Sequence, residues 1–116
     1  MKLKKKIVIV FLTFNSQKTI KKSILASLRI TKDIFVIDSF SKDKTQDICK
    51  KLGSNIISRK FKNYSDQRNW AINKFKNQYL WQLHLDADEK LDLKAINSIK
   101  SIVSSKKINK SVFLLR

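Results

Sequence analysis

The stretch Trp81-Gln-Leu-His-Leu-Asp-Ala-Asp-Glu89 joins an apolar run directly to a cluster of acidic residues. The run over 79–85 predicts a short buried strand, and Asp86 and Asp88 follow it one residue apart. In an open α/β sheet, ligands bind outside the carboxyl ends of the strands. Two carboxylates at this spacing can share one hard divalent cation, which prefers oxygen ligands. The stretch therefore predicts a buried strand that ends in a candidate metal site.

The acidic turn also has two other interpretations. Asp-x-Asp is short and common, and aspartate also occurs in ordinary turns and as a helix N-cap. A calcium loop starting at Asp86 is excluded, because Leu91 and Asn97 stand where that loop needs Gly and Glu. An ordinary turn stays open as the alternative to a metal site.

Apolar runs and amphipathic segments alternate along the whole chain. We expect strands over 7–13, 33–37, 55–58, 79–85 and 111–115, and helices over 17–29, after the loop 39–45, after 65–66 and over 93–104. This alternation predicts an α/β fold with a mostly parallel sheet and helices on both faces. No linker or repeat divides residues 1–116, so we expect a single domain.

Residue types that commonly end helices suggest where the helices begin and stop. Ser16 is the expected N-cap of the first helix, Ser65 or Asp66 of the third, and Asp92 of the fourth. Gly53 stands where the second helix is expected to end, because glycine readily adopts the left-handed conformation of a C-cap.

The composition is strongly basic, with a formal net charge of +17. Only four of the 26 basic residues are Arg, and Gly (1) and Pro (0) are nearly absent. AT-rich codons would produce the same skew, which weakens any inference from the charge to a nucleic-acid partner. A positive surface still favours phosphates, nucleotides and anionic lipid head groups. The single Cys49 excludes an internal disulfide, suits a reducing compartment and is expected to be buried.

The amino terminus has some features of a signal peptide, since residues 1–6 are basic and 7–12 are apolar. The apolar run is short, however, and no small-residue cleavage site follows it. No run reaches the length of about 20 residues that a membrane-spanning helix needs. We expect a cytoplasmic protein, either free or in peripheral contact with the inner face of the cytoplasmic membrane.

Polar clusters follow three of the expected strands: Thr13-Phe14-Asn15, Asp38 and Asp86-Ala87-Asp88. Right-handed crossovers would bring these three strand ends to one edge of the sheet. Three such clusters at one edge form a stronger signal than any of them alone.

Four ordered motifs, Thr13-Phe-Asn15, Val36-Ile-Asp-Ser-Phe-Ser41, Gln67-Arg-Asn-Trp-Ala71 and Leu85-Asp-Ala-Asp-Glu89, resemble family 2 glycosyltransferases of the GT-A fold. The sequences of the second and fourth motifs most resemble those of the branch that adds sugars to the lipopolysaccharide core. The resemblance extends from Lys6 to about Leu93 and implies a Rossmann-like, three-layer sandwich.

The resemblance also implies a binding site for a nucleotide-diphosphate sugar, with UDP favoured. Thr13, Phe14 and Asn15 match the first nucleotide-contacting loop of the family. Asp38 matches the acidic residue near the base and ribose, and Arg68 a basic residue near the uracil and diphosphate. Without the family resemblance, each residue has a simpler interpretation. Thr13 and Asn15 are then ordinary strand-end and turn residues. Asp38 is then a solvated carboxylate, and Arg68 is a charge on an exposed helix face.

Asp86 and Asp88 match the family's DXD motif. There one carboxylate touches the ribose, and the other holds Mn²⁺ or Mg²⁺ on the diphosphate. A divalent ion would offset the charge that grows on the leaving nucleoside diphosphate, and a nearby guanidinium would add a bidentate phosphate contact. Ser39 departs from many family members, which carry a second acidic residue there.

The resemblance implies an inverting, metal-dependent transfer to a lipopolysaccharide-type glycan or lipid acceptor. It also implies that the chain stops before the family's acceptor half, which supplies the general base that an inverting displacement needs. We therefore assign no catalytic residue and expect a truncated donor-binding domain. A fragment, a half that works with another chain and a non-catalytic remnant stay open.

Two functional classes other than a glycosyltransferase also stay open to comparison with the sequence. A basic module for nucleic acid or anionic membrane would explain the charge, but the lysines are scattered, Arg is scarce and no nucleic-acid motif is present. A receiver-like signalling domain lacks a clear phospho-acceptor aspartate at the third strand. His84, Trp70 and Trp81 are expected to be structural.

Overall fold

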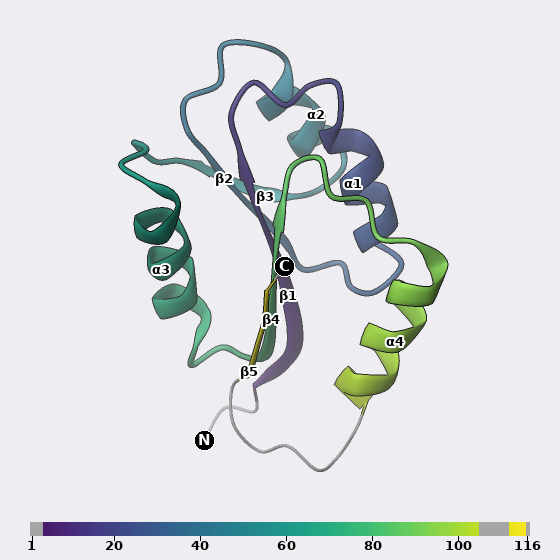
Figure 1. Ribbon diagram of the computed structural model, residues 1–116. Coiled ribbons are helices and arrows are strands. Elements are labelled where there is room, and N and C mark those ends of the chain that lie inside the picture. The colour runs from purple at the N-terminus through teal and green to yellow at the C-terminus, as the bar shows by residue number, and fades with distance from the viewer. Residues whose placement is uncertain (1–3, 105–111, 116) are drawn as a thin grey trace.

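The computed structural model describes residues 4–104 and 112–115 (Figure 1). The strands are β1 (Lys5–Thr13), β2 (Ile34–Asp38), β3 (Asn55–Ser58), β4 (Tyr79–Asp86) and β5 (Val112–Leu115). The helices are α1 (Ile20–Ser27), α2 (Thr45–Lys51), α3 (Tyr64–Phe75) and α4 (Leu93–Ser104). This order confirms the predicted alternation, although α1 is shorter than expected, and Ser111 lies outside the described residues.

In the described part of the chain, five strands form one sheet in the order β3-β2-β1-β4-β5. All four neighbouring pairs are parallel. Each connection between parallel strands must cross over the sheet, which is why a helix follows each of β1 to β4. The predicted parallel sheet is confirmed.

The central strand β1 is buried on both faces of the sheet, with Ile7 to Phe11 at most 4% exposed. Because side chains alternate along a strand, Ile9 and Phe11 join the core that includes residues of α1, α2 and α4. Val8 and Val10 pack on the opposite face with residues of α3. Figure 1 shows the resulting three layers, with α3 on one side of the sheet and the other helices on the second side.

Two of the expected helix ends are confirmed. Asp92 Oδ1 accepts a hydrogen bond from Ala95 N at 2.7 Å, as an N-cap of α4 should. Gly53 follows α2 with a φ of 81°, a left-handed conformation that glycine adopts without steric cost.

The other two expected caps are wrong. The side chain of Asn63, rather than Ser65 or Asp66, caps α3 by accepting from Asp66 N at 2.8 Å. For α1 the cap position falls on Thr19, which makes no side-chain cap bond. Ser16 instead donates its backbone N–H to Thr45 Oγ1 at 2.7 Å, which ties the loop after β1 to α2. A tertiary hydrogen bond to α2 therefore determines the role of Ser16, which is not a helix cap.

Several residues expected to be structural lie in the core. Cys49 is fully buried, and Trp81 is 3% exposed. Trp70 is half-buried against Phe35, with ring centroids 6.4 Å apart. None of the helices that the structure describes has the length and hydrophobicity needed to span a bilayer.

Candidate functional site

The carboxyl ends of β2, β1 and β4 lie next to one another at one edge of the sheet. Thr13 pairs with Asp38 across β1 and β2, and Leu12 pairs with Asp86 across β1 and β4. The three polar clusters therefore begin at nearly the same level of the sheet. The predicted common edge is confirmed.

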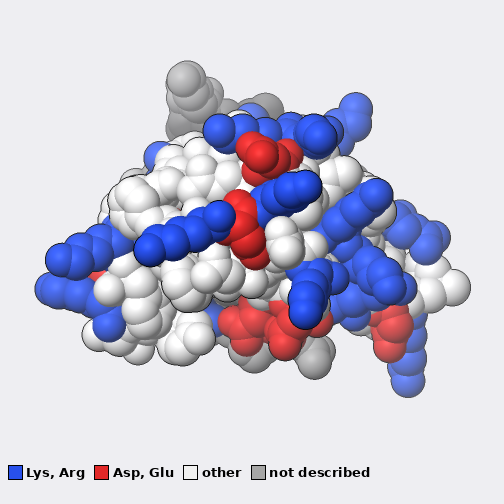
Figure 2. All heavy atoms as spheres, turned by 90° about the horizontal axis from the view of Figure 1, so that it is seen from above, with Lys and Arg blue, Asp and Glu red and all other residues white. Residues whose placement is uncertain are grey.

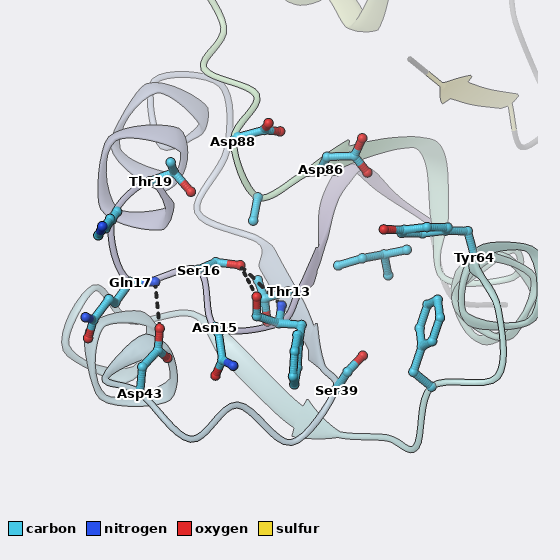
Figure 3. Close-up of a pocket in the computed structure, with 15 residues that line it drawn as sticks. Thr13, Asn15, Ser16, Gln17, Thr19, Ser39, Asp43, Tyr64, Asp86 and Asp88 are labelled. Carbon is cyan, nitrogen blue, oxygen red and sulfur yellow. Dashed lines mark hydrogen bonds between the residues drawn. The ribbon is translucent and has the colours of Figure 1, made fainter.

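A pocket of about 790 Å³ lies over this edge, within the usual size range of small-molecule sites. Its lining comes from four loops and the strand ends below them (Figure 3). The lining residues are Leu12 to Thr19, Ser39, Asp43, Phe61, Tyr64 and Asp86 to Asp88. Thr13, Phe14, Asn15, Asp86 and Asp88 thus meet in one pocket, whereas Asp38 and Arg68 are not among its lining residues.

Hydrogen bonds join the β1–α1 loop (14–19) to the β2–α2 loop (39–44). Ser39 N donates to the Thr13 carbonyl at 2.9 Å. Two residues further along each loop, Asn15 N donates to Ser41 Oγ at 2.7 Å. The Asn15 side chain then accepts from Lys42 N at 2.9 Å. These bonds fix one wall of the pocket.

Asn15 and Asp43 complete this wall. Asn15 has a φ of 47°, a left-handed conformation that asparagine tolerates better than most residues. Asp43 Oδ2 accepts from Gln17 N at 3.1 Å, a bond visible in Figure 3. Burial raises the pKa of Asp43, but hydrogen bonds from Thr45 and Gln17 together hold it below its usual value of 3.8. The ionised carboxylate therefore accepts from Gln17 in the β1–α1 loop and from Thr45 at the start of α2.

Asp38 lies beneath the pocket and is fully buried. Its carboxylate accepts from Thr13 Oγ1 at 2.6 Å, from the backbone N and Oγ of Ser41 at 2.7 and 2.6 Å, and from Gln46 Nε2 at 2.7 Å. The alternative that this carboxylate is solvated is wrong. Its oxygens instead tie the end of β1 to the β2–α2 loop, so Asp38 shapes the pocket from below.

Asp86 and Asp88 lie on one side of the pocket, with Asn15, Ser39 and Asp43 on the other side in the view of Figure 3. Both aspartates are exposed. A tight turn follows β4, in which Asp86 N donates to Glu89 Oε1 at 2.8 Å and Glu89 N donates to the Asp86 carbonyl at 3.0 Å. This turn returns the chain so that both carboxylates reach the same pocket.

These two carboxylates are compatible with a hard cation that is also bound by a phosphorylated ligand. The described residues hold no group of three or more His, Cys, Asp or Glu side chains that could enclose a metal ion. Mg²⁺ commonly uses one or two protein carboxylates and takes its other ligands from water and substrate phosphates. The donor set therefore fits a cation that binds together with a diphosphate.

Arg68 reaches the same strand end from α3. Its Nη2 lies 3.8 Å from Asp86 Oδ1, and its side chain is 25% exposed. Its buried Nε has no hydrogen-bond partner among the described residues. The guanidinium therefore adds a positive charge beside Asp86, just outside the lining of the pocket.

His84 lies on β4 two residues before Asp86 and is buried. Gln82 Nε2 donates to the Ile72 carbonyl, so Gln82 Oε1 faces the imidazole at 2.8 Å from His84 Nε2. Neutral His84 must then carry its proton on Nε2. Burial, and then the charge of Arg68, lower the pKa of His84 from 6.5 to about 4. The predicted structural role agrees with this setting.

Residues 8–100 match the sequence model described as Glycosyl transferase family 2. The chain belongs to this family. It is 33% identical to an uncharacterized glycosyltransferase of Rickettsia bellii over 103 residues, which cover 89% of this chain and 34% of that protein. An uncharacterized glycosyltransferase of Rickettsia typhi is 33% identical over 101 residues, covering 87% and 34%. The chain thus spans about a third of the length of these relatives.

Membership of glycosyl transferase family 2 agrees with the observed architecture, a Rossmann-like α/β fold of the GT-A type. The matched region includes all four loops around the pocket. The family resemblance inferred from the four sequence motifs is therefore confirmed at the level of the family.

The structure adds pocket residues to which the sequence of this glycosyl transferase domain assigned no role. Gln17, Ser39 and Asp43 line the pocket from the first two loops, Phe61 from the loop after β3, and Tyr64 from the first position of α3. The rings of Phe61 and Tyr64 meet edge to face, with centroids 5.1 Å apart. The available signal was their position in or next to the loops that follow the strands, but many other residues share that position.

Proposed function

We propose that this chain is the donor-binding part of a glycosyltransferase that takes a sugar from a nucleotide-diphosphate sugar, with UDP as the favoured nucleotide. The observation that carries the proposal is the joining of Thr13, Asn15, Asp86 and Asp88 in one pocket at the carboxyl edge of the sheet. Ligands of open α/β sheets bind at this edge. Family membership supports a nucleotide-sugar donor.

In this proposal the nucleoside lies along the joined loops. Phe14 lines the pocket and is 60% exposed, so its ring is available to a base. Asn15 offers its side chain from the same loop, and Thr13 borders the pocket floor. Asp38 contributes by holding the β2–α2 loop in place through its four hydrogen bonds.

The diphosphate would lie between the acidic turn and α3. Asp86 and Asp88 would hold Mn²⁺ or Mg²⁺, and Asp86 would also reach the ribose. When bound, the cation would offset the negative charge that develops on the leaving diphosphate. Arg68 lies beside Asp86 and would add a guanidinium contact to a phosphate.

For the acceptor we propose a cell-envelope glycan or lipid of the lipopolysaccharide type. The reaction would invert the anomeric centre, which requires a base to take the proton of the acceptor hydroxyl. We assign that base to none of the described residues. A protein with this function would work in the cytoplasm, in peripheral contact with the anionic inner face of the membrane.

The test is the thermal stability of the purified chain with UDP, GDP, CMP or dTDP, each with and without Mn²⁺. A ligand that binds only the folded state raises its stability, by about 2.7 kcal/mol at a hundred times its Kd. For a domain of this size that corresponds to a rise in Tm on the order of 10 °C. We expect such a rise for UDP, and only with Mn²⁺.

Two variants make this test specific to the site. Asp88→Asn should abolish the manganese-dependent shift. Asp47→Asn removes the same charge from the exposed surface of α2, outside the pocket lining, and should preserve the shift. If no nucleotide raises the Tm, or if Asp88→Asn responds like the unchanged chain, the proposed donor site is wrong.

A further inference from the structure

Two phenylalanines occupy matching positions in the joined loops after β1 and β2. Phe14 stands between Thr13 and Asn15, and both of these neighbours are hydrogen bonded to residues on either side of Phe40. Phe14 is 60% exposed and Phe40 is 57% exposed. We call this pair the aromatic tip. It places two large exposed apolar side chains on two loops that are hydrogen bonded to each other.

Phe40 is the unusual member of the tip, because its φ is 57°. Left-handed backbone is costly for a bulky residue, whereas Gly, Asn and Asp tolerate it. Among the residues that the structure describes, the other left-handed non-glycine residue is Asn15, which is of a tolerant type and whose side chain bonds to the facing loop. Phe40 gains little from core packing, and it is not among the residues that line the donor pocket. Neither folding nor the proposed donor site explains an exposed phenylalanine here.

Basic residues surround the tip. The loops after β1, β2 and β3 (14–19, 39–44 and 59–63) contain six Lys or Arg and a single acidic residue, Asp43. Their lysines are all exposed: Lys18, Lys42, Lys44, Lys60 and Lys62. The loop after β4 (87–92) instead contains three acidic residues and one lysine. Figure 2 views this edge from above and shows Lys and Arg side chains projecting widely over it.

We propose that Phe40 at the aromatic tip and the lysines of these loops form a docking surface for the head groups of an anionic lipid membrane. An apolar ring enters the boundary between head groups and acyl chains, while lysines are drawn to the negative surface. Phe14 stays on the donor pocket that it lines. The charge complementarity and the exposed Phe40 ring are independent observations, and both point to this partner.

This inference deepens the proposed function and rests on it for one consequence only. If the tip lies on the membrane, the donor pocket opens beside the surface in which a lipid-linked acceptor is anchored. The docking itself requires no donor. Vesicle binding and nucleotide binding can therefore fail independently of each other.

The test is co-sedimentation of the chain with vesicles of phosphatidylcholine, with and without phosphatidylglycerol. We expect binding to the anionic vesicles only, and weaker binding as the salt concentration rises. Phe40→Gly removes the ring and places glycine where φ is already 57°. This variant should fold at least as stably as the unchanged chain and bind anionic vesicles several-fold more weakly.

A matched pair of charge variants separates local docking from general attraction. Lys42→Glu changes the charge beside the tip, and Lys32→Glu makes the same change in the exposed segment before β2, at the opposite edge of the sheet. One basic residue near an anionic surface contributes about a fivefold factor in affinity. Lys42→Glu should therefore weaken vesicle binding about tenfold or more, and Lys32→Glu should leave it nearly unchanged.

Three results would overturn the proposal. Equal losses in Lys42→Glu and Lys32→Glu would assign the binding to the diffuse charge of the whole chain. Unchanged vesicle binding in Phe40→Gly would remove the ring from the interface. Failure to bind anionic vesicles, together with binding of single-stranded RNA that depends on Phe40 and Lys42, would assign the tip to nucleic acid. The nucleotide-dependent Tm of the same variants shows whether the donor pocket is intact.

Discussion

Arg68 on α3 places its guanidinium 3.8 Å from the Asp86 carboxylate at the end of β4. The two side chains come from different elements and meet at the edge where the donor pocket opens. Both are partly exposed to solvent, at 25% and 54%, and such ion pairs contribute little to folding. The pairing therefore contributes little to stability, and under the proposed function its role is to bind the ligand.

Replacing Arg68 with Met should weaken nucleotide binding and leave the fold nearly intact. Met retains much of the apolar stem that packs against neighbouring groups, so we expect a stability change within about 1 kcal/mol. The Tm rise with UDP and Mn²⁺ should be largely lost. Arg68→Lys should lie between the two, because lysine keeps the charge without the planar fork. An unchanged Tm rise in Arg68→Met would show that this arginine does not contact the donor.

Without nucleotide, the same substitution should have the opposite effect on the metal. The positive charge of Arg68 opposes a cation at Asp86, so Arg68→Met should bind Mn²⁺ alone several-fold more tightly. The measurement is the free Mn²⁺ signal by electron paramagnetic resonance during titration. Weaker Mn²⁺ binding than in the unchanged chain would contradict this assignment of the cation to Asp86.

Asp38→Asn should destabilise the fold and loosen the pocket. The buried carboxylate accepts four hydrogen bonds, whereas an amide presents an NH₂ group to some of the same donors. We expect a loss of about 2–4 kcal/mol, because buried donors are left unsatisfied. Urea unfolding measures this loss. Asp47→Asn, on the exposed face of α2, should stay within about 0.5 kcal/mol, and an equally mild Asp38→Asn would contradict the prediction.

His84 should make the folded state less stable as the pH falls below about 6.5. Its pKa is about 4 in the fold, so the unfolded chain binds a proton between these two values that the folded chain does not. Stability is therefore complete above the unfolded pKa and decreases as the pH falls to about 4, by up to about 3 kcal/mol. Urea unfolding at a series of pH values gives this slope.

The control for this pH effect is His84→Gln, which should have a flatter profile over the same window. The pKa values of Asp43 and Asp66 lie below 3.8, so these groups lose their contributions only at lower pH. His84 is the one histidine of the chain, so a single imidazole signal in an NMR titration reports its pKa. A value near 6.5 in the folded chain would overturn the prediction.

Asn63→Ala should destabilise the fold by about 1 kcal/mol, the usual loss when a helix N-cap is removed. Its side chain accepts the N–H of Asp66 at the start of α3. Ser65→Ala is the matched control, because Ser65 lies within the first turn and is exposed. Urea unfolding of both variants should show a loss only in Asn63→Ala. An equal loss in Ser65→Ala would mean that the cap is placed incorrectly.

The type and order of the described elements could be predicted because they depend on neighbours a few positions apart. The apolar run before Asp86 could form only a buried strand in this context, and the spacing of Ile96, Ile99 and Val103 indicated a helix. Asp92 and Gly53 were also readable, since each acts on the backbone next to it.

Caps and buried charges were harder to predict, because several residue types compete for the same local role. Ser16 has the chemistry of an N-cap, but it bonds to Thr45, a residue 29 positions away. Asp38 is of a type that is usually solvated, and it is buried only because donors from β1 and α2 converge on it. No local pattern contains these partners.

From the sequence alone, the alternation of strands and helices, the polar strand ends and the family motifs could be recognised. These features lie within short segments of sequence, because hydrophobic periodicity and residue type determine the conformation of the backbone next to them. The tertiary structure was needed to show that Asp38 lies beneath the pocket, that Arg68 faces Asp86, and that Phe14 and Phe40 share one exposed tip. Each of these relationships joins distant parts of the chain, and the parallel sheet brings those parts together only when the chain folds.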